Sequence, residues 1–313
     1  MNLSKILIMT SKIRNILYLL RIRQYYKNAM IFVGIFFSER LFETSLYFNI
    51  IIGFIILCLA SSFNYIINDI RDIEKDKKHP EKLKKKPLAS GDLPISFALL
   101  LLIIICCIIA FSIVFLIPNF SFMIMVLLLI FTGQLYNHVF KNFAFIDILV
   151  LSTGYLWRVL AGCIIIEEYV SAWLLLAIFE IAIFLSIAKR KGDLRLLGNE
   201  AAIEHKKVYD QYSLQLLDQF HAIIAGALFM TYSLYLILKF NLFIPGSASN
   251  YEFIAIGSIP ISLYLLMRFM YLTSAKPEIA RNSEKAFLDK GMIIAALLLV
   301  IILFFSFYFD DII

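Results

Sequence analysis

The chain has 313 residues, of which 61% are hydrophobic and 17% charged, with a formal net charge of +6 and a mean hydropathy of +0.85. Soluble domains are usually about 45–50% apolar and about 25% charged, so this composition excludes tandem soluble domains and indicates an integral membrane protein. The apolar residues form long continuous runs, which excludes a barrel of short alternating strands.

The predicted fold is all-α, a polytopic bundle of about nine transmembrane helices in one domain over residues 1–313. A basic, amphipathic N-terminal segment precedes the first span. Lys and Arg gather in alternate loops, which places the N-terminus in the cytoplasm and the C-terminus outside a plasma (inner) membrane. The loops 69–93 and 189–213 form a polar cap on the cytoplasmic face, and no nucleic-acid partner is expected. The expected spans are roughly 24–42, 46–68, 94–117, 120–138, 145–166, 171–188, 214–238, 251–272 and 291–309.

Acidic residues gather where the second expected span leaves the membrane, in the segment "NDIRDIEKD". Asn68, Asp72 and Asp76 are spaced i, i+4, i+8, so a continuing helix would carry them as one stripe, with Asp69 beside it. Hard oxygen ligands of this kind suit Mg2+, which commonly takes one or two carboxylates together with substrate phosphates. The alternative is that these acids pair with neighbouring bases along a solvated helix.

A lysine run from Lys82 to Lys86 follows the acids. Most of it is explained by membrane topology and by anionic lipid headgroups. Lys86 differs, because Pro87 and Gly91 turn the chain back into the third span and bring this lysine near the acidic stripe.

Two ionisable residues lie inside expected spans, Arg158 in the fifth and Glu180 in the sixth. Charges at this depth are costly, so by default they are paired or functional. We expect the two to face each other or to line one cavity, as a structural pair rather than as catalytic groups. Tyr136, at the end of the fourth span, could reach a phosphate or sugar, or could be an ordinary interfacial anchor.

Four segments together resemble the UbiA superfamily of intramembrane prenyltransferases, and more narrowly the branch that includes decaprenyl-phosphate phosphoribosyltransferase. They are "RIRQYYKN" at 21–28, "NDIRDIEKD" with "HPEKLKKKPLASG" at 68–91, "DILVLSTGYLWRVLAGC" at 147–163 and "AKRKGDL" at 188–194. The resemblance implies a UbiA-type bundle around a central cavity open to the cytoplasmic face. It also implies a Mg2+-dependent transferase that uses Asp69, Asp72 and Asp76 in catalysis and holds the metal with Asn68, Asp72 and Asp76.

The loop after the sixth span departs from the general family pattern, which has a second aspartate-rich motif there. Here the loop reads "KRKGDLRLL", and Asp193 is its only acid. Replacing acids by bases removes a metal site and adds anion contacts, which suits phosphoribosyl diphosphate with its separate sugar phosphate. We therefore expect a donor site of Lys86, Tyr136, Lys189, Arg190 and Asp193. The alternative for the basic triplet is a topological stop.

A third basic group, formed by Arg21, Arg23 and Lys27, lies where the first span enters the bilayer. Arg23 and Lys27 are one helical turn apart, and Gln24 and Asn28 are interleaved with the group. This group is predicted to bind the phosphate of a polyprenyl phosphate acceptor, although bulk anionic phospholipid is an equal alternative. The predicted reaction transfers a 5-phosphoribosyl group to the polyprenyl phosphate and releases pyrophosphate. The main alternative is an aromatic (4-hydroxybenzoate-type) polyprenyltransferase of quinone biosynthesis, which would need the missing second acid cluster. A transporter would explain intramembrane charges but not the acids and lysines gathered outside the membrane.

Overall fold

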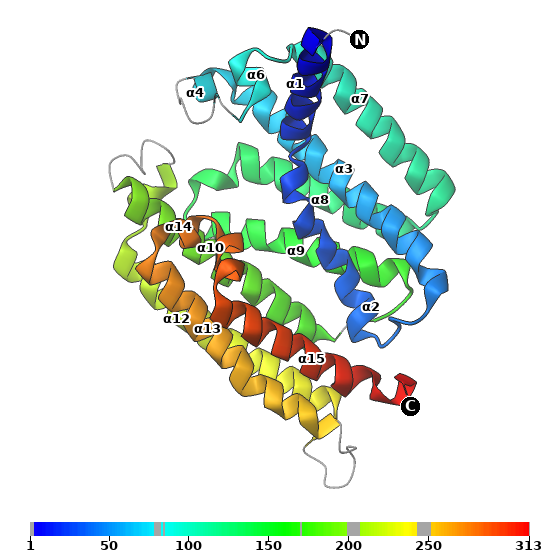
Figure 1. Ribbon diagram of the computed structural model, residues 1–313, viewed down its shortest axis with the longest axis vertical. Helices are drawn as coiled ribbons and strands as arrows, with labels where there is room; N and C mark the ends of the chain where they lie inside the picture. Colours follow the sequence, from blue (N-terminus) through cyan, green and yellow to red (C-terminus); the bar gives the residue numbers. More distant parts are fainter. Residues whose placement is uncertain are drawn as a thin grey trace. The chain divides into compact units, whose positions relative to one another are not determined.

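The computed structural model describes residues 3–77, 83, 85–169, 171–198, 207–242 and 252–312. Every regular element in these ranges is helical, which confirms the predicted all-α fold (Figure 1). Lys82 and Lys84 of the lysine run lie outside the described residues, as do residues 199–206 of the second predicted cap loop. The chain divides into two compact units, Met1–Asn137 with Trp157–Tyr169 and His138–Leu156 with Val170–Ile313. The single domain and the joint polar cap expected from the sequence stay predictions.

Unit 1 is built around the long helix α3 (Tyr47–Arg71), which packs against α1 (Leu3–Leu20), the 3-10 helix η1 (Ile22–Phe32) and α7 (Ile95–Phe111). Large apolar side chains such as Leu57 and Phe122 fill its core. The other elements of this unit are α2 (Val33–Phe37), η2 (Thr44–Leu46), α4 (Ile73–Lys77), α6 (Pro87–Ser90), the π-helical turn η3 (Ser112–Leu116), α8 (Phe120–His138) and the second half of α9 (Ile146–Ile165).

The first expected span, 24–42, is not one continuous α-helix. The chain takes a left-handed conformation at Arg21 (φ 53°), then runs as the 3-10 helix η1 and continues into the five-residue helix α2. Arg23, Gln24, Lys27 and Asn28 place polar groups in the first half of this segment. A segment with so many polar groups is costly to expose to hydrocarbon as a whole, which explains why it does not form a long apolar helix.

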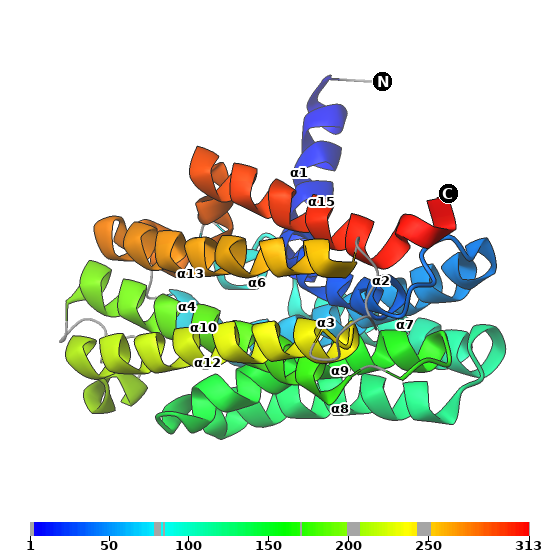
Figure 2. The same cartoon turned by 90° about the horizontal axis from the view of Figure 1, so that it is seen from below.

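Unit 2 is built from packed helices. Helix α10 (Ala172–Leu197) packs against α12 (Leu214–Lys239) and α14 (Pro277–Arg281). Helix α13 (Ser258–Ala275) packs along α15 (Lys290–Ile312), and Figure 2 shows α10 beside α12 and α13 beside α15. Serine caps start the longest two, since the Ser171 and Ser213 hydroxyls accept hydrogen bonds from first-turn amides. The other elements are η4 (Phe140–Asn142), the first half of α9, η5 (Lys207–Gln211), η6 (Glu252–Gly257) and η7 (Ser283–Leu288).

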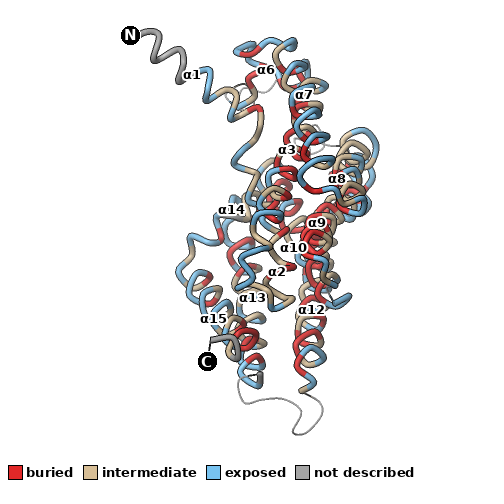
Figure 3. Tube along the Cα trace, turned by 90° about the vertical axis from the view of Figure 1, so that its right-hand side faces the viewer, coloured by how far each residue is buried: buried red, intermediate tan, exposed pale blue. Residues whose placement is uncertain are grey.

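Within the described part of the chain, eight helices are long and apolar enough to cross a membrane. They match eight of the nine expected spans, and the exception is the broken first one. Many large apolar side chains on these helices are exposed, for example Ile103 on α7 and Leu297 on α15, while buried residues concentrate along α3, α9 and α10 (Figure 3). Exposed apolar side chains on helices of this length face lipid, so the chain is a multi-pass membrane protein. The membrane-spanning ranges are Thr44–Arg71, Ile95–Leu116, Phe120–His138, Ile146–Ile165, Ala172–Leu197, Leu214–Lys239, Phe253–Ala275 and Lys290–Phe309.

Candidate functional site

An acidic cluster in unit 1 forms where α3 ends, around two buried carboxylates. Arg21 Nη2 donates to Asp69 Oδ1 at 2.7 Å, and Lys86 Nζ lies 3.1 Å from the same oxygen. The Lys86 ammonium also donates to Asp76 Oδ2. One ammonium thus bridges Asp69 and Asp76, and the guanidinium of Arg21 shares Asp69 Oδ1 with it.

Local sequence explains how these groups meet. Asp69 and Asp76 are seven residues apart, close to two helical turns, so they share a face even though α3 ends at Arg71 and α4 begins at Ile73. Lys86 reaches them because Pro87 starts the short helix α6, and Gly91 ends it in the left-handed conformation (φ 83°) that glycine adopts without strain.

Asn68 and Asp72, the other two predicted metal ligands, lie at the same helix end. The Asp72 N–H donates to the Asn68 carbonyl at 3.0 Å, and the Asp76 N–H donates to the Asp72 carbonyl at 2.8 Å, so the predicted spacing is kept through the break. Within the described residues, the Asp72 carboxylate has no hydrogen-bond or ion-pair partner, and no three acidic, histidine or cysteine side chains converge on one point. This donor set fits a Mg2+ ion whose coordination is completed by substrate phosphates and water, and does not fit a cage made by protein alone.

A pair of side-chain amides continues the polar face of α3 toward the middle of the membrane. Gln134 Nε2 on α8 donates to Asn64 Oδ1 at 2.6 Å, and Asn64 Nδ2 donates to the Leu129 carbonyl at 3.2 Å. Asn64 lies one helical turn before Asn68, so it extends the predicted stripe by one residue. Tyr136, predicted at the donor site, lies two residues beyond Gln134 on α8 and is partly buried.

The residues predicted at the acceptor phosphate divide into two environments within unit 1. Arg23 is exposed, and Gln24 and Lys27 are partly buried. Asn28 is fully buried, and its carboxamide oxygen accepts hydrogen bonds from Arg158 Nε at 2.7 Å and from the Ser61 hydroxyl at 3.1 Å. A direct phosphate contact by Asn28 would therefore require these hydrogen bonds to be exchanged.

Arg158 and Glu180 belong to different units, so the predicted facing of the two stays a prediction. Arg158 is buried in unit 1 and also donates from Nη2 to the Ser61 hydroxyl at 3.3 Å. Glu180 is buried in unit 2, where Thr231 is a hydrogen-bond partner and its Oε2 has none. Each side chain lies inside a membrane-spanning helix, as predicted.

The basic segment that was expected to start a loop at residue 189 is instead part of α10, which continues to Leu197. Its Arg190 is buried rather than open to solvent. Its Nε and Nη2 both contact Asp147 Oδ2 of α9, at 2.9 and 2.7 Å. The Tyr212 hydroxyl donates to the other oxygen of Asp147 at 2.7 Å, and burial raises the pKa of this phenol above its ordinary value of 10.0. Asp147 therefore already neutralises Arg190, the residue that was predicted to contact a donor phosphate.

Asp193 is held by residues from two other segments of unit 2. The Tyr209 hydroxyl donates to Asp193 Oδ2 at 2.6 Å, and Arg281 Nε lies 3.1 Å from Asp193 Oδ1. Burial raises the pKa of Tyr209, so its phenol stays protonated and can donate at neutral pH. Gly192 allows α14 to approach, because a Cβ at this position would lie 2.6 Å from the Arg281 amide nitrogen.

The two lysines of the basic triplet have opposite surroundings. Lys189 is exposed. Lys191 is buried, with its Nζ 2.5 Å from Asp218 Oδ1 and 3.3 Å from His221 Nδ1 on α12. Of the three cations, Lys189 is therefore the one whose head lies at the surface of unit 2.

Sequence reasoning missed several residues of these two clusters. Arg21 was grouped with the acceptor cations and instead binds Asp69, a partner 48 residues away. Asp147, Tyr209, Tyr212 and Arg281 were not singled out, although Asp147 begins the third of the four family-like segments and was a usable signal. Asn64 could have been found by extending the i, i+4 spacing of the stripe backward by one turn.

The model of the UbiA prenyltransferase family matches residues 29–289. Two relatives named decaprenyl-phosphate phosphoribosyltransferase, from Corynebacterium glutamicum and Mycolicibacterium smegmatis, are each 26% identical over 219 residues, which is 69% of this chain. The matched region spans 65% and 67% of their lengths. The solved structure of a UbiA homolog from Archaeoglobus fulgidus bound to DMAPP and Mg2+ has a TM-score of 0.66 at 15% identity, covering 96% of this chain and 100% of that one. The family match covers well over half of the sequence, and the chain therefore belongs to the UbiA prenyltransferase family.

Proposed function

We propose that the chain transfers a 5-phosphoribosyl group from phosphoribosyl diphosphate to a polyprenyl phosphate and releases pyrophosphate. The observation that carries this proposal is the acidic cluster at the end of α3. Two buried carboxylates, Asp69 and Asp76, are held there by cations, and the carboxylate of Asp72 is left without a partner among the described residues. The names of the two bacterial relatives support the choice of donor and acceptor.

Mg2+ is the metal that this donor set suits best. Asp72, Asp76 and the Asn68 carboxamide would hold it together with the donor diphosphate, because Mg2+ usually keeps several non-protein oxygen ligands. When bound, the ion neutralises the charge that develops on the departing diphosphate. The Mg2+ named in the Archaeoglobus structure supports this assignment as a property of the fold.

The remaining chemistry falls to the side chains. The bond from the anomeric carbon to the diphosphate breaks, the diphosphate takes the electron pair, and a lipid phosphate oxygen forms the new bond to that carbon. The acceptor oxygen is already anionic at neutral pH, so the chain has to orient it rather than deprotonate it. Asp69 would position the ribose end of the donor, with Lys86 and Tyr136 close to the diphosphate.

The two substrates would use separate cations. Lys189, exposed near the end of α10, would contact the sugar phosphate of the donor. Arg190 and Asp193 would hold this end of α10 in place. Arg23 and Lys27, with Gln24, would contact the lipid phosphate.

Orientation and location belong to the same proposal. The alternation of Lys and Arg between loops supports a cytoplasmic N-terminus, an external C-terminus and a reaction at the cytoplasmic face of the inner (plasma) membrane. The central cavity expected from the family would then open toward the aqueous donor.

The test is to incubate membranes containing the chain with radiolabelled phosphoribosyl diphosphate, a polyprenyl phosphate and Mg2+. We expect label in the lipid extract, no label when Mg2+ is chelated, and none with the Asp72→Asn variant. Transfer of an allylic diphosphate to an aromatic acid, with no turnover of phosphoribosyl diphosphate, would overturn the proposal in favour of an aromatic prenyltransferase.

A further inference from the structure

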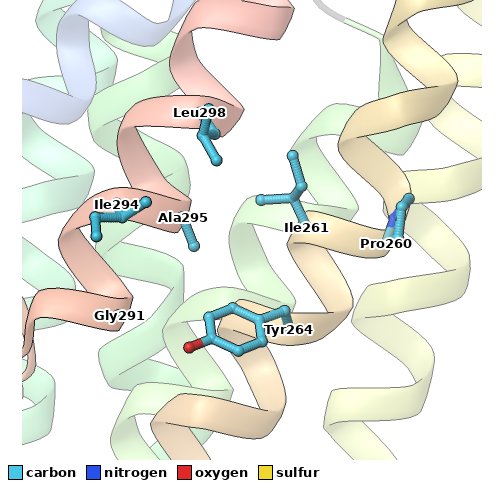
Figure 4. Close-up of a pocket in the computed structure, with 7 residues that line it drawn as sticks. All are labelled: Pro260, Ile261, Tyr264, Gly291, Ile294, Ala295 and Leu298. Carbon is cyan, nitrogen blue, oxygen red and sulfur yellow. The ribbon is translucent and has the colours of Figure 1, made fainter.

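An apolar groove runs between α13 and α15 of unit 2. Its volume is about 410 Å³, within the range of small-molecule sites. Figure 4 shows Tyr264 of α13 reaching toward Gly291 of α15, with Ala295 and Leu298 farther along α15. Both helices are membrane-spanning, so hydrocarbon rather than water surrounds this groove.

Small residues form the floor of the groove, and larger ones form its rims. Gly291 and Ala295 are four residues apart and therefore lie on one face of α15, and Ala295 is buried. Ile294 and Leu298 on α15 and Tyr264 on α13 are largely exposed along the edges. The result is an apolar groove whose exposed rims face the bilayer.

Polar groups gather at the Gly291 end of the groove. The Tyr264 hydroxyl lies against the Gly291 backbone, 2.7 Å from where a Cβ would stand, and it has no hydrogen-bond partner among the described residues. Arg268 is one turn farther along α13 and makes two hydrogen bonds to Asp289, at 3.0 and 2.8 Å. Lys290, the first residue of α15, is exposed, and it too has no partner in the described part of the chain.

We propose that this groove binds one acyl chain of an anionic glycerophospholipid. The chain would lie over Ala295, an ester carbonyl would accept a hydrogen bond from the Tyr264 hydroxyl, and the phosphate would lie at Lys290. Tyrosine rings commonly lie at the headgroup level of a bilayer, which is also the depth of the ester carbonyls of a glycerophospholipid. A polyprenyl phosphate has no ester carbonyl, so the phenol favours the glycerophospholipid.

The test uses the full chain in vesicles of phosphatidylcholine that contain phosphatidylglycerol with a photoactivatable group in one acyl chain. After illumination, the labelled peptides are identified by mass spectrometry. We expect labelling of the peptides that carry Tyr264 and residues 291–298. The Ala295→Phe variant fills the groove and should lose at least about four-fifths of the label. The matched control is Leu297→Phe, which adds the same ring at an exposed position of α15 outside the groove and should leave labelling unchanged.

Tyr264→Phe tests the polar end without changing the shape of the groove, and remains informative if Ala295→Phe does not fold. It should lower labelling by about two- to tenfold, the contribution of one hydrogen bond. Equal labelling in wild type, Ala295→Phe and Tyr264→Phe would show ordinary surrounding lipid and overturn the proposal. Displacement of the probe by unlabelled polyprenyl phosphate more readily than by unlabelled phosphatidylglycerol would also overturn it, by assigning the groove to a polyprenyl chain.

Discussion

Replacing Lys86 with methionine should destabilise the chain, because this ammonium joins two buried carboxylates. The Asp69 and Asp76 side chains are 3% and 2% exposed, and Lys86 itself is 16% exposed. Removing one partner from a buried ion pair costs about 3–5 kcal/mol. Since the lysine keeps some contact with solvent, we expect a loss of about 3 kcal/mol in the free energy of unfolding, near the lower end of that range.

The assay is thermal unfolding of the purified chain in detergent, in which about 3 kcal/mol corresponds to a fall in Tm of about 6–12 °C. Lys85→Met is the matched control. Lys85 is exposed in the same loop and has no ion-pair partner among the described residues, so its loss should stay within about 0.5 kcal/mol. Combining Lys86→Met with Asp76→Asn should recover much of the lost stability. The second change removes the Asp76 charge, which would otherwise face the Asp69 carboxylate without the bridging ammonium.

The same variant tests whether these carboxylates can hold a divalent cation. Millimolar Mg2+ should raise the Tm of Lys86→Met more than that of the wild type, because the ion can take the place of the ammonium. If Lys86→Met unfolds at the same temperature as Lys85→Met, the bridging ammonium does not stabilise the fold and the reasoning is refuted. Equal Mg2+ effects on variant and wild type would count against a metal between Asp69 and Asp76.

Three further predictions follow from the same structure. Asp72→Asn should abolish labelled phosphoribosyl transfer while leaving Tm within about 2 °C, since its carboxylate has no partner among the described residues to lose; near-normal Mg2+-dependent turnover would remove Asp72 from the metal site. Lys189→Gln should raise the donor KM or lower kcat/KM about tenfold or more, with little loss of stability. Arg190→Gln should instead lower the free energy of unfolding by about 3–5 kcal/mol, because it leaves Asp147 buried without its ion pair. Equal stability of the two variants would contradict this difference. Arg158→Leu and Glu180→Leu should each destabilise by several kcal/mol, and the double change should recover much of that loss if the charges face each other; additive losses would show that they do not.

The charged residues near the end of α10 differ in how they are surrounded. In the last turns of α10, Arg190 binds Asp147, Asp193 binds Tyr209, and Lys191 binds Asp218, so three charged residues of this segment have partners within unit 2. Lys189 is exposed beside them.

The sequence by itself predicted the membrane class, eight of the long helices and the placement of the acids at the end of α3. These features depend on composition, on the length of apolar runs and on helical spacing, all of which can be read within about twenty residues. The return of Lys86 toward Asp69 and Asp76 was equally local, because Pro87 and Gly91 define a one-turn helix by their backbone preferences.

Tertiary structure decided which charges are neutralised. Arg21 binds Asp69 across 48 residues, and Arg190 binds Asp147 across 43. In sequence, Arg190 and Lys189 are adjacent cations with the same topological meaning, yet one is buried against an acid and the other is exposed. Successive residues of a helix point about 100° apart, so only the packing of α10 against its neighbours determines which cation is buried and which remains at the surface.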